Sequence, residues 1–97
     1  MTVKEKMHAG EPYVMADDPE LMKYQQECLD KLFEYNSLRP SETEKKTALL
    51  KEMFAEIGED CYIETPFHAN FGGAHVHFGK NVYANFNLTL VDDTHIY

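Results

Sequence analysis

The feature that most constrains the fold of this chain is a six-residue repeat in its C-terminal part. From Phe78 onwards the sequence divides into FGKNVY, ANFNLT, LVDDTH and IY. The first position holds Phe78, Ala84, Leu90 or Ile96, and the fifth holds Val82, Leu88 or Thr94, with Val76 one repeat earlier. Paired antiparallel strands would alternate with a period of two. Two rows with a period of six instead predict a parallel β-helix, in which each block forms one side of a coil.

Turn-forming residues stand between the aliphatic rows. Gly79 and Asn81 lie where the coil would change direction, because glycine and asparagine tolerate tight or left-handed backbone. The polar side chains between the rows would point outward, within reach of a ligand. Only about three blocks are visible, so periodicity alone leaves a small twisted antiparallel sheet open as the alternative.

The N-terminal part of the chain has the spacing of helices. Thr2 is a suitable N-cap for a short helix through VKEKMHA, which Gly10 can end in a left-handed conformation. Asp18 and Pro19 then predict the start of a longer helix with one apolar stripe, closed near Asn36.

A third helix is predicted from a capping box formed by Ser41 and Glu44, with its end at Gly58. The sequence that follows is rich in β-branched and aromatic residues separated by Gly, Asn and Asp. We therefore expect an α+β protein in two parts. Residues 1–60 would form a helical N-terminal cap, and residues 61–97 the truncated start of a β-helix domain.

The charge balance argues against a nucleic-acid partner. Asp and Glu number 17 against 9 Lys and Arg, a formal charge of -8, which repels nucleic acid and anionic lipid. The segment MTVKEKMHAGEPYVM contains no apolar run long enough for a signal peptide or a membrane span. Cys28 and Cys61 lie far apart, outside any CxxC spacing. These features predict a cytoplasmic protein with free thiols rather than a disulfide or a zinc site.

Three segments resemble the N-terminal part of the maltose/galactoside O-acetyltransferases, which are hexapeptide-repeat acyltransferases. They are KEKMHAGEPY (4–13), EYNSLRPSETEKKTALLKEMFAEIGED (34–60) and HVHFGKNVYANFNLTLVDD (75–93). The resemblance implies a left-handed parallel β-helix behind a small helical cap, assembled as a homotrimer. It also implies that acetyl-CoA and a sugar acceptor meet in the groove between neighbouring subunits. A catalytic histidine would take the proton from a sugar hydroxyl that attacks the thioester.

The resemblance implies roles for five residues of this chain. Asn85 would contact the acceptor near its reacting hydroxyl and also approach the acetyl-CoA. Asp93 would accept hydrogen bonds from acceptor hydroxyls, and Tyr83 would shape the same pocket. Asn70 falls where relatives carry Asp or Ser and can still bind a sugar hydroxyl. Asp17 lies near the position of an acidic acceptor contact, across a one-residue gap in the alignment.

Some positions depart from the family pattern. Gln25 stands where relatives usually place an arginine near the acceptor, and GGAH at 72–75 is one residue longer. The family's catalytic histidine lies in a downstream HP dipeptide, beyond Tyr97. The chain therefore resembles the N-terminal half of an enzyme, and alone we expect it to be inactive. The alternatives are a non-catalytic sugar-binding or oligomerisation module, and a generic small α+β interaction domain.

The histidines and paired carboxylates do not supply another site. His75 and His77 would project to one face, but no third metal ligand has a convincing spacing, so we predict no metal site. His95 follows two carboxylates and could mimic an acid/base pair, although we do not expect it to replace the missing base. Asp92 and Asp93 are adjacent on a strand and point to opposite faces, so they cannot flank one glycosidic bond.

Overall fold

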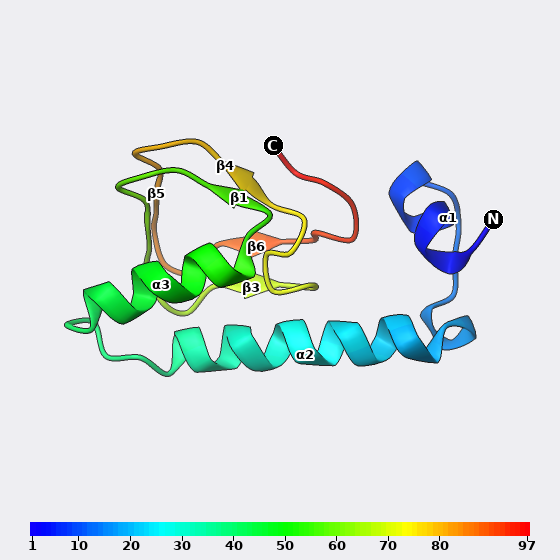
Figure 1. The fold of residues 1–97 in the computed structure, drawn as a ribbon, viewed down its shortest axis with the longest axis horizontal. Helices are drawn as coiled ribbons and strands as arrows, with labels where there is room; N and C mark the ends of the chain where they lie inside the picture. Colours follow the sequence, from blue (N-terminus) through cyan, green and yellow to red (C-terminus); the bar gives the residue numbers. More distant parts are fainter.

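The computed structural model describes residues 1–97 and contains three α-helices, a short 3₁₀ turn and six two-residue strands. Their bounds are α1 Val3–Ala9, η1 Met15–Asp17, α2 Pro19–Asn36, α3 Thr43–Met53, β1 Glu56–Ile57, β2 Tyr62–Ile63, β3 His68–Ala69, β4 His77–Phe78, β5 Tyr83–Ala84 and β6 Thr89–Leu90. Figure 1 shows the strands wound above the long helix α2, with α3 against the coil and α1 at the opposite end of α2. None of these helices is both long and apolar enough to cross a membrane.

The strands form successive turns of a parallel coil. β1 pairs with β4, β2 with β5 and β3 with β6, and every pair is parallel. Consecutive strands belong to different sheets, so the chain follows three sides before it returns to the first. A further parallel bridge joins Val76 to Ile96. The predicted parallel arrangement is therefore confirmed, and the antiparallel sheet considered as the alternative is wrong. The left-handed sense of the coil stays a prediction.

The coil begins earlier than the sequence pattern indicated. Residues predicted to end the third helix, Glu56–Ile57, form strand β1 and pair with His77 and Phe78. The helix ends at Met53, and Phe54 has extended backbone with φ -84 and ψ 148. The error arose because Ile57 continues the apolar spacing of the helix, whereas in the structure it starts the six-residue row. The division of the chain into two domains at residue 60 stays a prediction.

The predicted capping box of α3 is also wrong. Glu42, not Ser41, is the N-cap residue, and its side chain makes no capping hydrogen bond to the helix. The Glu42 carboxylate instead accepts from the Arg39 backbone N–H at 2.9 Å and lies 3.0 Å from Lys45 Nζ. The helix therefore begins at Thr43, and the Glu42 carboxylate bonds to groups other than the N–H groups of the helix.

The other helix ends are confirmed. Thr2 and Glu5 form a reciprocal capping box on α1, and Gly10 ends that helix in the left-handed conformation, with φ 75. Asp18 caps α2 by accepting from the Leu21 N–H at 3.0 Å. Asn81, predicted at a corner of the coil, also has left-handed backbone, with φ 60.

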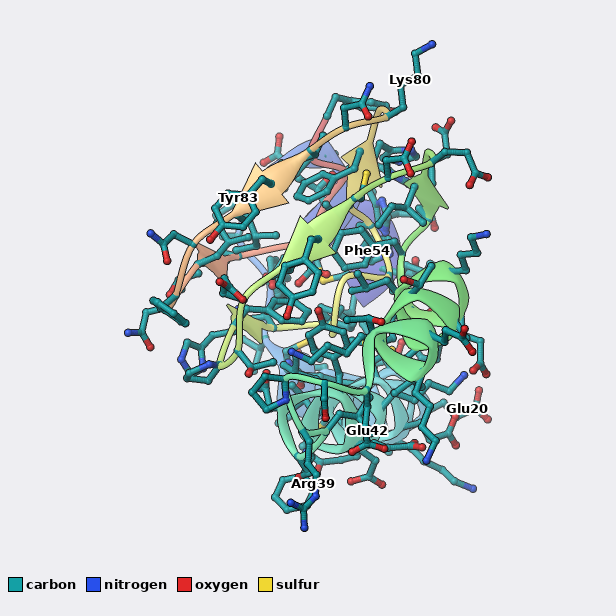
Figure 2. The ribbon with its side chains drawn as sticks, turned by 90° about the vertical axis from the view of Figure 1, so that its left-hand side faces the viewer. Glu20, Arg39, Glu42, Phe54, Lys80 and Tyr83 are labelled. Carbon is teal, nitrogen blue, oxygen red and sulfur yellow. The ribbon has the colours of Figure 1, made fainter.

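The larger of two apolar clusters lies between the helices and the coil. Phe54, which Figure 2 places between the strands and the helices, packs edge-on against the Phe67 ring. The Tyr35 hydroxyl is fully buried and donates to the Ile63 carbonyl oxygen at 2.6 Å. The Asn36 side chain both donates to the carbonyl and accepts from the N–H of Phe67, at 2.9 and 3.1 Å. These hydrogen bonds fix α2 against the coil, because buried polar groups are costly when unpaired.

Candidate functional site

A loop between β3 and β4 is held in place by the carboxylate of Asp92. This side chain is fully buried, and its two oxygens accept from the backbone N–H groups of Phe71 at 2.7 Å and Gly73 at 2.8 Å. The Asp92 carbonyl oxygen is hydrogen-bonded to His75 Nδ1 at 2.6 Å. The longer GGAH segment is thus an anchored loop that packs on α2. Asp92 and Asp93 have separate partners, as expected for adjacent residues of an extended segment.

The two glycines of this loop are needed for close approach. A Cβ on Gly72 would lie 2.4 Å from the Cys28 carbonyl oxygen of α2, and one on Gly73 would lie 2.5 Å from the Phe54 ring. Both residues also have positive φ, 59 and 98, which side chains rarely adopt. The loop can therefore sit against both helix and core only with glycine at these positions.

Asp93 is the centre of a second group of contacts. Its Oδ1 accepts from Asn70 Nδ2 at 3.0 Å, and its Oδ2 accepts from the Tyr13 hydroxyl. Gln25 Nε2 donates to the Asn70 carbonyl oxygen at 3.1 Å. We call these four residues, Tyr13, Gln25, Asn70 and Asp93, the Asp93 cluster. The hydrogen bond to the Asp93 carboxylate raises the pKa of Tyr13 to about 12, because the neutral phenol is the donor.

The Asp93 cluster contains two of the five predicted site residues. Asn70 and Asp93 were predicted, and Gln25 was noted as a departure from the family pattern. Tyr13 was not singled out, although it closes the KEKMHAGEPY segment. No local pattern could identify it, because its partner lies 80 residues away in sequence.

Tyr83 and Asn85 lie on another side of the coil. The Tyr83 side chain is 62% exposed, points outward in Figure 2, and donates its hydroxyl to Glu64 Oε2 at 3.0 Å. The bond to this carboxylate raises the pKa of Tyr83. Its ring stacks on that of Tyr62, with centroids 6.4 Å apart. Asn85 is exposed, and its Oδ1 accepts from the neighbouring Phe86 N–H at 2.8 Å. No hydrogen bond joins this pair to the Asp93 cluster.

Asp17 lies at the end of η1, four residues beyond Tyr13 in sequence. Its side chain is exposed and takes part in no hydrogen bond or ion pair within the chain. The structure therefore does not bring Asp17 into direct contact with Asp93.

Four of the five histidines gather where α1 meets the coil. The His8 ring lies 4.8 Å from that of His75 and 5.4 Å from that of His95, measured between centroids. His77 Nε2 is hydrogen-bonded to His95 Nδ1 at 2.7 Å, and His77 Nδ1 lies 2.5 Å from Glu56 Oε1. Burial lowers the pKa of His8, and the neighbouring imidazoles lower it further. No three ligating side chains of the chain are arranged to hold a metal ion.

The sequence matches a known family over more than half of its length. A family model described as "Maltose acetyltransferase hexapeptide capping motif" matches residues 6–58. A galactoside O-acetyltransferase of Lactococcus lactis subsp. lactis (strain IL1403) is 52% identical over 92 residues, covering 95% of this chain and 44% of that protein. The chain belongs to the maltose/galactoside O-acetyltransferase family. A galactoside O-acetyltransferase of Escherichia coli (strain K12) is 50% identical over 62 residues, covering 64% of this chain and 30% of that protein.

Solved structures of similar proteins have the same fold. A galactoside acetyltransferase in complex with coenzyme A superposes with a TM-score of 0.87 at 38% identity, over 98% of this chain and 46% of that one. The hexapeptide-repeat-containing acetyltransferase VCA0836 from Vibrio cholerae, complexed with acetyl coenzyme A, gives 0.79 at 25% identity, over 98% and 50%. The chain thus spans about half the length of its relatives, and its structural neighbours are hexapeptide-repeat acetyltransferases.

Proposed function

We propose that this chain is the acceptor-binding N-terminal portion of an acetyl-CoA-dependent O-acetyltransferase, which transfers an acetyl group to a sugar hydroxyl of the maltose or galactoside type. The Asp93 cluster carries the proposal, because it offers an oriented carboxylate to a ligand rich in hydroxyl groups. Its support is 52% identity to a galactoside O-acetyltransferase and similarity to a structure that contains coenzyme A.

The chemistry follows from the groups on the two sides of the coil. Asp93 and Asn70 have acceptor lone pairs left for sugar hydroxyls after their mutual hydrogen bond. Asp17 would contact the acceptor from η1. On the β5 side, the amide of Asn85 would contact acetyl-CoA and the acceptor, and Tyr83 would shape the pocket. Acetyl-CoA is a co-substrate in this reaction, and no metal is required.

The reaction itself is direct acyl transfer. The sugar oxygen forms a bond to the thioester carbonyl carbon, the carbon–sulfur bond breaks, and the hydroxyl proton passes through a base to the departing thiolate. We assign that base to the family's histidine, which we expect downstream of Tyr97. His75 and His77 are already bound, to the Asp92 carbonyl and to Glu56 and His95. The 97-residue chain alone would therefore be inactive.

We also propose a cytoplasmic homotrimer. The Asp93 cluster and the Tyr83–Asn85 pair lie on different sides of one coil, so a groove between neighbouring subunits would bring two such sides together. Three apolar side chains on this outer surface support an interface there. They are Tyr83, Phe86 and Val91, each between 62% and 63% exposed. Cys28 and Cys61 are both free, as suits a reducing compartment.

A second candidate is a non-catalytic sugar-binding or oligomerisation module. One observation favours it: the Asp93 cluster is complete within these 97 residues and needs no downstream side chain for its hydrogen bonds. Such a protein would bind sugar and release no coenzyme A.

The first experiment is the intact mass of the protein purified from its own source, followed by an assay for free coenzyme A. A mass near 11.2 kDa, with sugar binding and no transfer, would favour the module. A mass about twice as large, with thiol release that depends on maltose, glucose or a galactoside, would support the transferase. In that protein Asp93→Asn should reduce transfer, whereas Asp30→Asn, an exposed change on α2, should not. Equal activity of wild type and Asp93→Asn would contradict the assignment of the site.

A further inference from the structure

Both oxygens of the Asp93 carboxylate are held by side chains from distant parts of the sequence. Tyr13 comes from the link between α1 and η1, whereas Asn70 directly follows β3. Asn70 is itself fixed, because its carbonyl accepts from Gln25 and its N–H donates to the Leu90 carbonyl at 3.3 Å. A carboxylate with both oxygens hydrogen-bonded cannot rotate freely about its side-chain bonds.

This arrangement determines which lone pairs of Asp93 stay open to a ligand. An ionised carboxylate accepts about four hydrogen bonds, and Tyr13 and Asn70 occupy one position on each oxygen. Because folding has already fixed the carboxylate, a ligand does not have to order it on binding. A free aspartate at the same place would lose rotamer freedom with every binding event.

Most of the groups that remain open around Asp93 are hydrogen-bond acceptors. The Tyr13 oxygen keeps its lone pairs after donating its proton, and the side-chain oxygen of Asn70 has no partner within the chain, while one N–H of Asn70 Nδ2 remains as a donor. No lysine or arginine forms an ion pair with Asp93. The group therefore suits a ligand that donates several hydroxyl protons, and it disfavours a phosphate or carboxylate, which would face the Asp93 charge.

We propose that Tyr13 is a positioning residue for the acceptor: its hydroxyl holds Asp93 in the orientation in which the remaining lone pairs of that carboxylate bind acceptor hydroxyls. This inference rests on the proposed transferase function. It assigns a role to Tyr13, a residue of the N-terminal segment that would act on the acceptor indirectly, by orienting Asp93. The Tyr13 phenol is protonated at neutral pH, as any tyrosine is, and its bond to Asp93 raises its pKa further, as expected for the donor of that bond.

The variant that tests the proposal is Tyr13→Phe in the complete protein that carries this chain. The aromatic ring packs beside the cluster of Met7, Leu21 and Phe71, so phenylalanine keeps that contact and removes only the hydroxyl. We expect the acceptor KM to rise about tenfold, the equivalent of about 1.4 kcal/mol, with the acetyl-CoA KM within about twofold of wild type. Tyr24→Phe, which removes a hydroxyl from α2 outside the Asp93 cluster, is the matched control and should leave both constants unchanged.

A double-mutant cycle separates positioning from a general structural effect. In an Asp93→Asn background the Tyr13 hydroxyl has lost its charged acceptor, so Tyr13→Phe should add little to the acceptor KM. If Tyr13→Phe does not fold, Tyr13→Met keeps a flexible apolar side chain against Met7 and replaces it in the same cycle.

The outcomes distinguish the inference from the function on which it rests. A wild-type protein that acetylates a sugar, with a Tyr13→Phe acceptor KM within twofold, would overturn the role of Tyr13 and leave the transferase intact. Equal increases in the KM of both substrates, or the same increase in Tyr24→Phe, would also overturn it. If the wild-type protein transfers acetyl to no sugar, the transferase proposal fails and the role of Tyr13 fails with it.

Discussion

The side of the coil that carries Asp92 and Asp93 and the side that carries Tyr83 and Asn85 are held in different ways. On one side, Asp92 and Asp93 bind groups that are between 19 and 80 residues distant in sequence. On the β5 side, Asn85 bonds only to the next residue and Tyr83 to the adjacent turn of the coil. The first side is organised within one chain, whereas the second remains open to a ligand or another subunit.

Under the proposed function, this difference would divide the binding of ligands between the two sides of the coil. Long-range hydrogen bonds to a buried or half-buried carboxylate fix geometry before a ligand arrives. An exposed tyrosine and an exposed amide would gain their final positions only on contact with a ligand or a second surface. Changes on the Asp92–Asp93 side should therefore affect folding strongly, and changes on the β5 side should affect it little.

The largest effect is expected from Asp92→Ala. This change leaves the buried N–H groups of Phe71 and Gly73 without an acceptor, at a cost of about 3–5 kcal/mol in the free energy of unfolding. Urea denaturation followed by circular dichroism measures the loss. Asp30→Asn, on the exposed face of α2, serves as the control and should stay within about 0.5 kcal/mol of wild type. A small loss in Asp92→Ala would mean that the loop does not depend on this carboxylate.

Gly73→Ala should have the second largest effect. The new Cβ would lie 2.5 Å from the Phe54 ring, at a residue whose φ is 98, and overpacking of this kind costs about 1–3 kcal/mol. Gly79→Ala is a matched control, because a Cβ there meets no atom within 4 Å. The same urea experiment compares the two variants, and similar midpoints would contradict the close approach of the loop to Phe54.

Much of this architecture could be predicted because its signals are local. Thr2, Gly10 and Asp18 mark helix ends within a few residues of the groups they bond. The six-residue repeat predicted a parallel coil from the sequence alone, without knowledge of tertiary contacts. The turn that begins at Glu56 was missed because Ile57 fits a helical stripe as well as a strand, and only pairing with β4 decides between them.

The Asp93 cluster could not be predicted completely from local sequence signals. Family resemblance pointed to Asn70 and Asp93, but neither spacing nor composition connects either residue to Tyr13. That contact exists because the link between α1 and η1, which carries Tyr13, comes close to the C-terminal part of the coil, and this is a property of the whole chain. The ligand-binding roles of Asp17, Tyr83 and Asn85 stay predictions.

A smaller effect is expected from pH at the junction of α1 and the coil. His8 faces His75 and His95, with Lys4 nearby on its own helix, and burial and these charges lower its pKa below 6.5. Below pH 6.5 the unfolded chain therefore binds more protons at His8 than the folded chain, and stability is lost as pH falls through the lowered pKa. Unfolding free energies at pH 8 and pH 5.5 should differ less in His8→Gln than in wild type. His68→Gln, at an exposed position on β3, should keep the wild-type difference, and an unchanged difference in His8→Gln would contradict the prediction.

The smallest effect on folding is expected from Tyr83→Phe. The Tyr83 hydroxyl bonds to Glu64 on an exposed surface, where water replaces a lost partner, so the melting temperature should not change measurably. If the β5 side is completed by a second subunit and the sugar acceptor, the same variant should raise the acceptor KM of the complete protein and leave folding unaffected. Lys80→Ala, at a solvent-exposed corner of the coil (Figure 2), is the control and should change neither quantity. A large drop in the melting temperature of Tyr83→Phe would show that the β5 side is as firmly organised within one chain as the Asp93 side, and the contrast between the two sides would no longer hold.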